Sequence, residues 1–314
     1  MKNTNSMTIT SVPGIMVGQV EDVEAGTGCT VIVAKNGAVG GVDVRGSAPG
    51  TRETDLLNPV HTVERVHAVV LSGGSAYGLS AAGGVMQALE EMGIGLDVGV
   101  AKVPIVPAAV LFDLAYKSAT VRPDEAMGNA AAKLATSAPV KEGSVGAGCG
   151  ATVGKLLGME RASKGGIGSY AMAVGELIVG AIVAVNALGE VINPENGEII
   201  AGIRQQDGPI DEPHGAFIKS IEVLKSAQSE AFFGQNTTIG CIATNAKLSK
   251  AEANKVAQMA HDGLAKTIRP VHTPYDGDTL FALSTGDVQS RVELVGALAV
   301  EVIARSVVNA VQSS

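Results

Sequence analysis

Apolar residues alternate or recur at regular spacings along the chain, and this pattern predicts a mixed α/β fold. Short runs rich in β-branched residues predict strands at 30–34, 38–44, 66–71, 169–185, 237–244 and 279–284. Apolar positions at helical spacing predict helices over 75–92, 124–136, 249–267 and 290–311. This order of elements suits an α/β sandwich with sheets inside and helix layers outside.

Local signals at the ends of the early segments refine this picture. Asn36-Gly37 is the favoured pair for a type I′ turn, so it predicts a β-hairpin between the first two strands. Ser75 is expected to cap the helix that follows it. Residues 193–197 contain Pro, Asn and Gly and predict a turn.

Similar signals mark the last two helices. Ser249 with Glu252, and Ser290 with Glu293, match the capping box that opens a helix. Residues 203–235 are polar and uneven and predict a long loop, mobile in part, that leads to the strand at 237.

Composition limits the class of protein and its partners. Of the 314 residues, 46% are hydrophobic, which is enough for a substantial core. Forty glycines without tryptophan predict small aliphatic side chains in the core and close contacts between backbones. The net charge is −8 without a basic cluster, which disfavours a nucleic acid or an anionic membrane as partner.

The termini and cysteines indicate the compartment. Residues 1–6 lack the apolar core of a signal peptide, and no apolar run reaches membrane length without interruption. The cysteines at 29, 149 and 241 are odd in number and too far apart for a metal pattern. We therefore expect a cytoplasmic protein that uses no metal and no cofactor.

Two glycine-rich stretches suggest phosphate-binding loops but fail closer inspection. Residues 73–75 fit neither a dinucleotide fingerprint nor a P-loop. The second stretch ends in Gly154-Lys155, yet Cys149 and Leu156 stand where a P-loop requires glycine and a hydroxyl residue. We do not expect a nucleotide at either stretch.

Candidate chemistry gathers in the last quarter of the chain. Thr237 lies where a Gly/Gln/Asn segment turns into a strand, which suits a nucleophile. Asp276 and Asp278 flank a glycine on a turn that leads into the next strand. A calcium loop is disfavoured because an apolar strand follows this turn directly. A hydroxyl and two carboxylates are thus expected to meet at neighbouring strand ends.

Several motifs together resemble one known family along nearly the whole chain. They are NTTI at 236–239, RPVHTPYDGDT at 269–279, PGTRETD at 49–55, LSGGSAYG at 71–78 and GAGCGAT at 146–152. In this order they are similar to the DmpA-type peptidases, the L-aminopeptidase/D-esterase family. That family also contains β-peptidyl aminopeptidases and endo-type nylon (6-aminohexanoate) oligomer hydrolases.

The resemblance implies a fold and a maturation step. It implies a four-layer αββα sandwich of the DmpA/ornithine acetyltransferase type that cuts itself before a Ser or Thr. The matching bond is Asn236-Thr237, so a single domain, 1–314, would be processed to an α chain of 1–236 and a β chain of 237–314. Thr237 would then be an N-terminal nucleophile whose own α-amine, with an ordinary pKa of about 8, takes the proton.

The resemblance also implies roles for neighbouring residues. Asp276 and Asp278 would orient the amine and the hydroxyl. Asn186 matches an asparagine whose side-chain amide donates to the oxyanion. Lys155 matches a lysine whose charge would lower the pKa of the Thr237 amine and help to hold the oxyanion, although a surface lysine fits the sequence equally well.

Phe112 and Tyr77 are expected to contact substrate. Relatives often have tyrosine at the position of Phe112, and its hydroxyl is assigned to the oxyanion site. Because that hydroxyl is absent here, a main-chain N–H or another side chain must replace it, or the pocket differs.

The expected activity is aminopeptidase-like hydrolysis of small peptides, amino-acid amides or esters. Alternatives are an endo-type 6-aminohexanoate oligomer hydrolase, a self-cleaving acyltransferase, and a non-catalytic scaffold. The resemblance further implies a homotetramer of cleaved α/β pairs.

Overall fold

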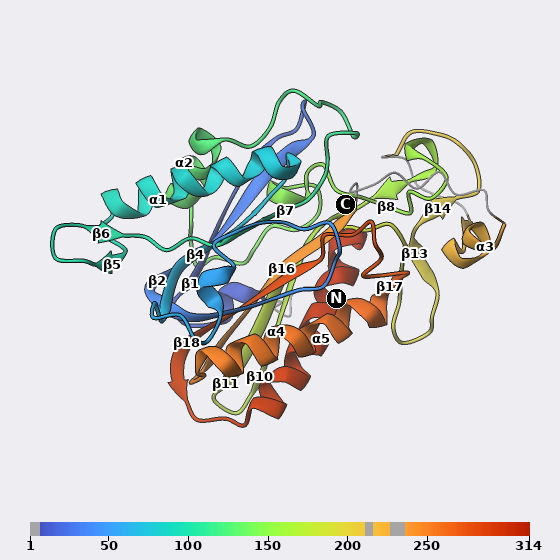
Figure 1. Cartoon of the computed structure of the whole chain (residues 1–314). Helices are drawn as coiled ribbons and strands as arrows, with labels where there is room; N and C mark the ends of the chain where they lie inside the picture. The colour runs from blue at the N-terminus through green and yellow to red at the C-terminus, as the bar shows by residue number, and fades with distance from the viewer. Residues whose placement is uncertain (1–6, 211–215, 227–235) are drawn as a thin grey trace.

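The computed structural model describes residues 7–210, 216–226 and 236–314, and its centre is a nine-stranded mixed sheet (Figure 1). Along one path the strands are β10 (Gly166–Val174), β11 (Leu177–Asn186), β16 (Thr237–Ala246), β18 (Thr279–Val288), β2 (Thr27–Val44), β4 (Arg65–Ser72), β7 (Ala108–Val110) and β3 (Gly50–Arg52). β1 (Ile15–Asp22) pairs with β2 off this path. The pairs β16–β18 and β4–β7 are parallel, and the other pairs are antiparallel.

Helices cover both outer faces of the folded sheet. Figure 1 shows α1 (Ala81–Glu91) and α2 (Glu125–Lys133) above the strands, and α4 (Lys250–Thr267) and α5 (Val292–Gln312) below them. Two parts of the sheet face each other between these helix layers. The predicted four-layer αββα sandwich is thereby confirmed.

Alternation along the strands builds three apolar layers. In β2, Val31 and Val33 pack toward α1 and α2, whereas Ile32 packs between the two parts of the sheet. In β18, Phe281 joins the same middle layer, and Leu280 faces α4 and α5. Because side chains alternate between faces, strands buried on both sides become continuously apolar, as these strands are.

The long strand β2 corrects one prediction. Asn36-Gly37 does not form a hairpin, because β2 runs through it from Thr27 to Val44. Gly37 has a φ of +71°, and the pairing with β4 shifts its register between Val33 and Ala38. β2 pairs with β1 before this irregularity and with β18 after it. The Asn-Gly pair therefore serves as a bulge that carries one strand from one part of the sheet to the other.

Helix boundaries confirm some predicted caps and correct others. Ser249 and Glu252 form the complete capping box of α4. Ser75 does not cap a helix: it opens a 3-10 helix, Ser75–Ser80, with a φ of +54°, and α1 begins only at Ala81. α5 begins at Val292, and its start carries no side-chain cap from Ser290.

The predicted loop at 203–235 contains regular structure in its described part. β14 (Ile203–Arg204) pairs with β15 (Phe217–Ile218), and α3 (Ser220–Lys225) follows. Residues 211–215 and 227–235 lie outside the described residues, as do residues 1–6.

α5 is the one described helix that is long and apolar enough to cross a membrane. Two thirds of its most apolar window, 67%, is buried inside the protein. Its Val295, Val302 and Ile303 belong to the apolar layer against β11 and α4. This burial is what a core helix shows.

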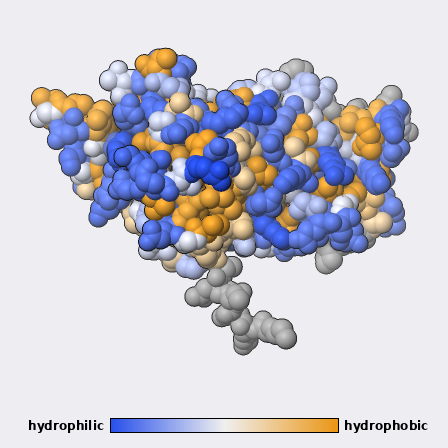
Figure 2. Space-filling view, turned by 90° about the horizontal axis from the view of Figure 1, so that it is seen from below, coloured by the Kyte–Doolittle hydropathy of each residue, from blue (hydrophilic) through white to orange (hydrophobic). Residues whose placement is uncertain are grey.

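A small hairpin projects from one end of the molecule. β5 (Leu96–Asp97) and β6 (Lys102–Val103) form it at the far left of Figure 1, and apolar atoms mark the same end in Figure 2. Val100 at its tip is 96% exposed. The apolar side chains of this hairpin do not contribute to the core of the chain.

Glycines allow helices to approach the sheet closely, as the composition predicts. A Cβ built on Gly41 of β2 would lie 2.4 Å from the main-chain nitrogen of Asn254 in α4. A Cβ on Gly168 of β10 would lie 2.2 Å from the main-chain oxygen of Ser306 in α5. Such distances are too short for any side chain, so these helices pack directly on the backbone.

We therefore expect Gly41→Ala to destabilise the fold by about 1–3 kcal/mol, because α4 must move away from β2. Gly208→Ala is the matched control, since the nearest atom to its Cβ would be 3.4 Å away. Urea unfolding measures the free energy of unfolding of both variants. Equal values for the two would contradict the packing argument.

Candidate active site

Thr237 is the first residue of β16, a strand whose ten residues are all buried. β11 lies on one side, where Asn186 is the register partner of Thr237. On the other side, Asn236 forms a bridge with Asp276, just before β18. The hydroxyl of Thr237 is therefore held where three segments, distant in sequence, come together.

The peptide carbonyl before Thr237 has two donors. The Thr237 hydroxyl donates to the main-chain oxygen of Asn236. The main-chain N–H of Gly277 donates to the same oxygen at 3.0 Å. Gly277 also lies against the hydroxyl, because a Cβ built on it would be 2.9 Å from Thr237 Oγ1. A glycine is thus required at the point where the turn meets the threonine.

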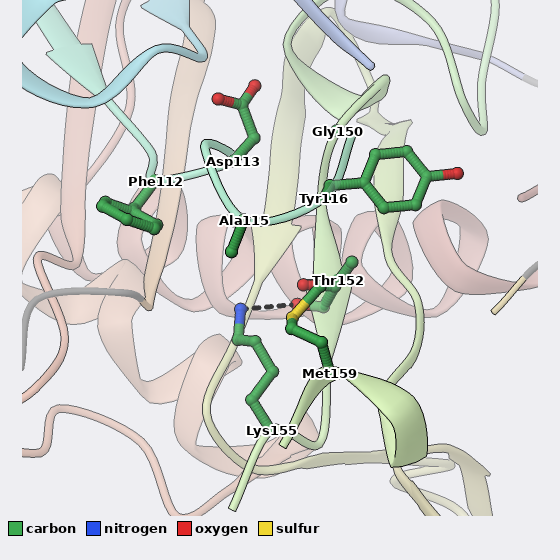
Figure 3. A pocket seen from close by; sticks show the side chains of 8 residues that line it. All are labelled: Phe112, Asp113, Ala115, Tyr116, Gly150, Thr152, Lys155 and Met159. Atoms are coloured by element: carbon green, nitrogen blue, oxygen red, sulfur yellow. Dashed lines mark hydrogen bonds between the residues drawn. The ribbon is translucent and has the colours of Figure 1, made fainter. Parts of the chain in front are cut away.

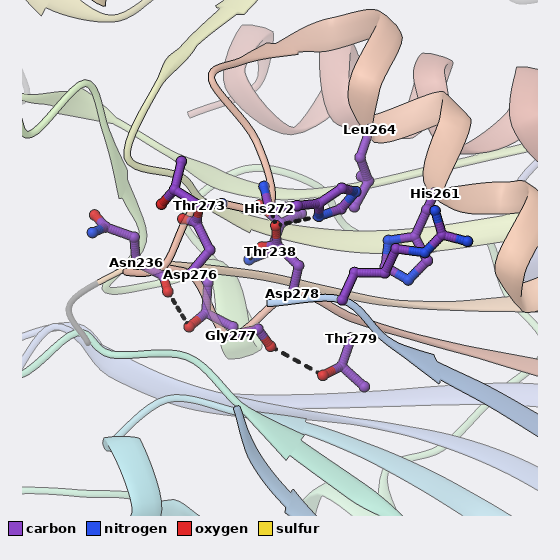
Figure 4. A network of polar contacts seen from close by, with 12 residues as sticks. Asn236, Thr238, His261, Leu264, His272, Thr273, Asp276, Gly277, Asp278 and Thr279 are labelled. Carbon is purple, nitrogen blue, oxygen red and sulfur yellow. Dashed lines mark hydrogen bonds and ion pairs between the residues drawn. The ribbon is translucent and has the colours of Figure 1, made fainter. Parts of the chain in front are cut away.

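The two predicted carboxylates are buried and have separate partners (Figure 4). Asp278 Oδ1 accepts the main-chain N–H of Thr238 at 2.7 Å. Asp276 Oδ2 accepts the main-chain N–H of Thr273 at 2.7 Å. Burial, together with the neighbouring charge of Asp278, raises the pKa of Asp276 to about 6. Asp276 can therefore gain or lose a proton in the pH range where enzymes work.

Lys155 and Asn186 form a second buried pair beside these carboxylates. Lys155 Nζ donates to Asn186 Oδ1 at 2.8 Å, to Asn186 O at 3.1 Å and to Thr152 O at 3.0 Å. With Oδ1 occupied, the amide Nδ2 of Asn186 points the other way and donates to Phe112 O at 2.9 Å. Lys155 thus fixes the orientation of the Asn186 amide.

The charge of Lys155 is tuned by its surroundings. Burial lowers the pKa of Lys155 to about 7, although the charges of Asp276 and Asp113 oppose this shift. The three oxygen acceptors around Nζ also favour the ammonium. Lys155 is 7% exposed, so it is not the surface lysine that the sequence allowed.

Phe112 takes part through its backbone. Its side chain lines a small pocket together with Thr152, Lys155 and Met159 (Figure 3). Its carbonyl accepts from Asn186, so the loop after β7 is tied to the site without a tyrosine hydroxyl.

Tyr77 lies apart from this network among the described residues. It is 61% exposed on the 3-10 helix before α1. Its ring stacks on the Arg122 guanidinium, with the carbon Cζ 3.7 Å from the ring centroid. The structure does not bring Tyr77 together with the other predicted site residues.

Sequence reasoning missed two groups that support the site. Asp113, next to Phe112, accepts from Thr27 Oγ1 at 2.7 Å and from the main-chain N–H of Gly74 at 2.7 Å. Its carboxylate points away from Lys155 (Figure 3), and burial raises its pKa. His272 Nδ1 lies 2.8 Å from Asp278 Oδ2. Asp113 adjoins Phe112 in the sequence, and His272 lies in the motif at 269–279 that carries Asp276 and Asp278, which are the signals that could have drawn attention to them.

Main-chain carbonyls of the glycine-rich stretch at 146–151 contact the side-chain ammonium of Lys164. Lys164 Nζ donates to the main-chain oxygens of Gly148, Ala151 and Gly165 at 2.9–3.2 Å. A phosphate loop would direct N–H groups inward, and here carbonyl oxygens converge. This polarity agrees with the rejection of a nucleotide site. Within the described ranges, no three His, Cys, Asp or Glu side chains are placed to share a metal ion.

Comparison with known proteins identifies relatives that span most of the chain. An uncharacterized aminopeptidase of Mycobacterium tuberculosis is 42% identical, over 95% of this chain and 92% of that protein. A 6-aminohexanoate-oligomer endohydrolase of Kocuria sp. is 34% identical, over 88% of this chain and 74% of that protein.

Solved structures share the fold at lower identity. A beta-aminopeptidase of Burkholderia sp. aligns with a TM-score of 0.66 and 21% identity, over 99% of this chain and 89% of its own. A second structure is the L-aminopeptidase D-Ala-esterase/amidase of Ochrobactrum anthropi, which is described as a variant of the Ntn hydrolase fold. It aligns with a TM-score of 0.68 and 18% identity, over 98% of this chain and 86% of its own. The family model described as Peptidase family S58 matches residues 7–314. This chain therefore belongs to peptidase family S58, whose members hydrolyse amide bonds.

Proposed function

We propose that the chain cuts itself between Asn236 and Thr237 and that the freed Thr237 is the nucleophile of an amide hydrolase. The observation that carries this proposal is the arrangement at the Asn236 carbonyl, with the Thr237 hydroxyl and the Gly277 N–H on its oxygen.

The self-cleavage step follows from these contacts. Thr237 Oγ1 forms a bond to the carbonyl carbon of Asn236, and negative charge develops on the oxygen that Gly277 N–H already holds. The C–N bond to Thr237 then breaks, and the hydroxyl proton passes to the departing nitrogen. Water opens the resulting ester and leaves a free α-amine on Thr237.

The mature enzyme repeats this acyl transfer on its substrate. The α-amine of Thr237 accepts the hydroxyl proton, because an α-amino group is partly neutral near pH 8. Asp278 holds the adjacent Thr238 N–H, and Asp276 supplies charge beside the threonine. Acyl transfer from the substrate to Oγ1, followed by attack of water, completes the cycle.

Lys155 contributes by charge and orientation. All three of its donated hydrogen bonds go to protein oxygens, so it does not donate directly to a substrate oxyanion. Its bond to Oδ1 orients the Asn186 amide. In its charged form Lys155 also favours the neutral Thr237 amine, an effect that fades as pH rises through its pKa of about 7. The family resemblance assigns the oxyanion donor to Asn186, the strand partner of Thr237, whose Nδ2 donates to Phe112 O in this structure.

Two substrate classes are supported to different degrees. Aminopeptidase activity on small peptides or amino-acid amides is favoured, because relatives bearing that name match at 42% identity over 95% of the chain. Hydrolysis within 6-aminohexanoate oligomers is the second candidate, supported by the relative at 34% identity. The homotetramer of cleaved pairs and the cytoplasmic location stay predictions.

Thr237→Ala is expected to abolish both self-cleavage and turnover, because no hydroxyl remains to attack. Intact mass under denaturing conditions should show fragments 1–236 and 237–314 for the wild type and one chain for the variant. Thr237→Ser is the control that keeps a hydroxyl and should still be cut. Fragments from the alanine variant would exclude Thr237 as the nucleophile.

Blocked and unblocked substrates separate the candidate activities. We expect an amino-acid p-nitroanilide with a free amine to be hydrolysed with a kcat/KM at least about 100-fold higher than its N-acetyl form, because a site built to pair a free amine leaves its polar groups unpaired with the acetylated form. Efficient cutting of N-acetylated 6-aminohexanoate oligomers would instead support the endohydrolase. Transfer of the acyl group to an added amino-acid acceptor, with little release of the free acid, would indicate an acyltransferase.

Asp276→Asn should stabilise the fold at neutral pH, although it removes a catalytic carboxylate. The ordinary pKa of 3.8 is raised to about 6 in the folded chain, so the wild type loses stability as pH rises through this window. The variant has no such loss and should be more stable by about 3 kcal/mol at pH 8, at 1.36 kcal/mol per pKa unit. Urea unfolding at pH 4.5 and pH 8 measures the difference in free energy of unfolding between the proteins with Asp276 and with Asn at this position. Both proteins carry Thr237→Ala, which keeps them uncut. A difference that does not grow with pH would contradict the raised pKa.

A further inference from the structure

The loop that leads into the carboxylate turn contributes an imidazole with no assigned role. His272 follows β17 (Ile268–Arg269), and two of its donors converge on one oxygen of Asp278. Its main-chain N–H lies 3.1 Å from Asp278 Oδ2, and its ring Nδ1 lies 2.8 Å from the same atom. The other oxygen, Oδ1, accepts the N–H of Thr238. The Asp278 carboxylate therefore bridges His272 to the residue next to the nucleophile (Figure 4).

The contacts define how the His272 ring is protonated. An ionised carboxylate only accepts hydrogen bonds, so Nδ1 must carry the hydrogen. Nε2 is buried and has no hydrogen-bond partner in the described part of the chain. A hydrogen placed there would be an unpaired buried donor, which is costly. The arrangement thus places a ring hydrogen on Nδ1.

A second buried histidine, His261, packs against the ring of His272. The ring of His261, on α4, meets the ring of His272 edge to face, with centroids 4.8 Å apart. His261 Nε2 lies 3.1 Å from the main-chain oxygen of Asp43, so this nitrogen carries the hydrogen. Burial lowers the pKa of His261 to about 4, which keeps this ring neutral at neutral pH. The His272 ring is held in place by an uncharged neighbour.

The backbone at His272 restricts which residues can occupy the position. Its φ is +56°, a left-handed conformation shared by only two other non-glycine residues of the described chain. Asn, Asp and His adopt this conformation more readily than other side chains. A residue here must therefore tolerate the left-handed backbone and also present a donor to Asp278.

We propose that His272 is a positioning residue that holds the Asp278 carboxylate on the Thr238 amide and thereby orients Thr237 for attack. It acts through Asp278 and does not touch the reacting atoms. This inference rests on the proposed role of Thr237 for its catalytic consequences. The hydrogen-bond arrangement itself is independent of that role.

Two variants of similar shape test the proposal. His272→Asn keeps the left-handed backbone and offers an amide N–H to Asp278, whereas His272→Asp keeps the backbone but opposes Asp278 with a second negative charge. We expect the aspartate variant to lose at least about 100-fold in kcat with KM within about threefold, and to cut itself more slowly. The asparagine variant should stay within about tenfold of the wild type. Thermal unfolding shows whether each variant is folded.

Each outcome decides the proposal. Wild-type kcat in a folded aspartate variant would overturn it, because the donor would be dispensable. Equal losses in the two variants would also overturn it, since the asparagine donor would then not replace the imidazole. A lower thermal midpoint in the aspartate variant with kcat unchanged would leave His272 a purely structural role.

Imidazole NMR tests the arrangement without relying on catalysis. Long-range nitrogen–proton NMR spectra of protein labelled with nitrogen-15 histidine should show that the His272 ring carries a hydrogen on Nδ1. The His272 signals are identified by their absence in His272→Asn. A ring protonated on Nε2 alone would overturn the proposal. Failure of the proposed function would appear differently, as turnover or cutting that survives Thr237→Ala.

Discussion

The carbonyl of Asn236 is held rigidly against two donors, and the rest of the site depends on this. β16 lies between β11 and β18, so its first residue has little freedom to move. Asn186 comes from the end of β11, and Gly277 comes from the turn before β18. Neighbouring strand ends therefore bring the hydroxyl, the amide and the carboxylates together in one fixed arrangement.

Buried charges at the site are balanced by many oxygen and N–H partners. Lys155 and Lys164 each donate three hydrogen bonds, mostly to main-chain carbonyls, while Asp276 and Asp278 accept main-chain N–H groups. This is how a chain can bury ionisable groups at a tolerable cost. The glycine-rich stretch makes the arrangement around Lys164 possible, because residues without side chains let carbonyl oxygens converge on one ammonium.

Predictions from local sequence were right where the interactions lie within one turn of a helix. They were wrong where pairing with distant strands determined the backbone. The Ser249–Glu252 capping box formed as predicted because both of its bonds lie within one helical turn. Asn36-Gly37 has the composition of a hairpin turn, but β2 gains more by pairing with β1, β4 and β18 along its length. Ser75 adopts a left-handed backbone after β4 and leaves the start of α1 to Ala81.

The sequence by itself determined the layered α/β class, the strand that begins at Thr237 and the turn that carries Asp276 and Asp278. These features follow from alternation of apolar residues, from turn chemistry and from several motifs in order, all of which are local properties of the chain. Only the tertiary structure decided which groups contact one another: Gly277 on the Asn236 carbonyl, Lys155 on Asn186, and His272 on Asp278. Such contacts join positions that strand pairing and burial bring together, and neither spacing nor composition specifies where a buried donor will find its acceptor.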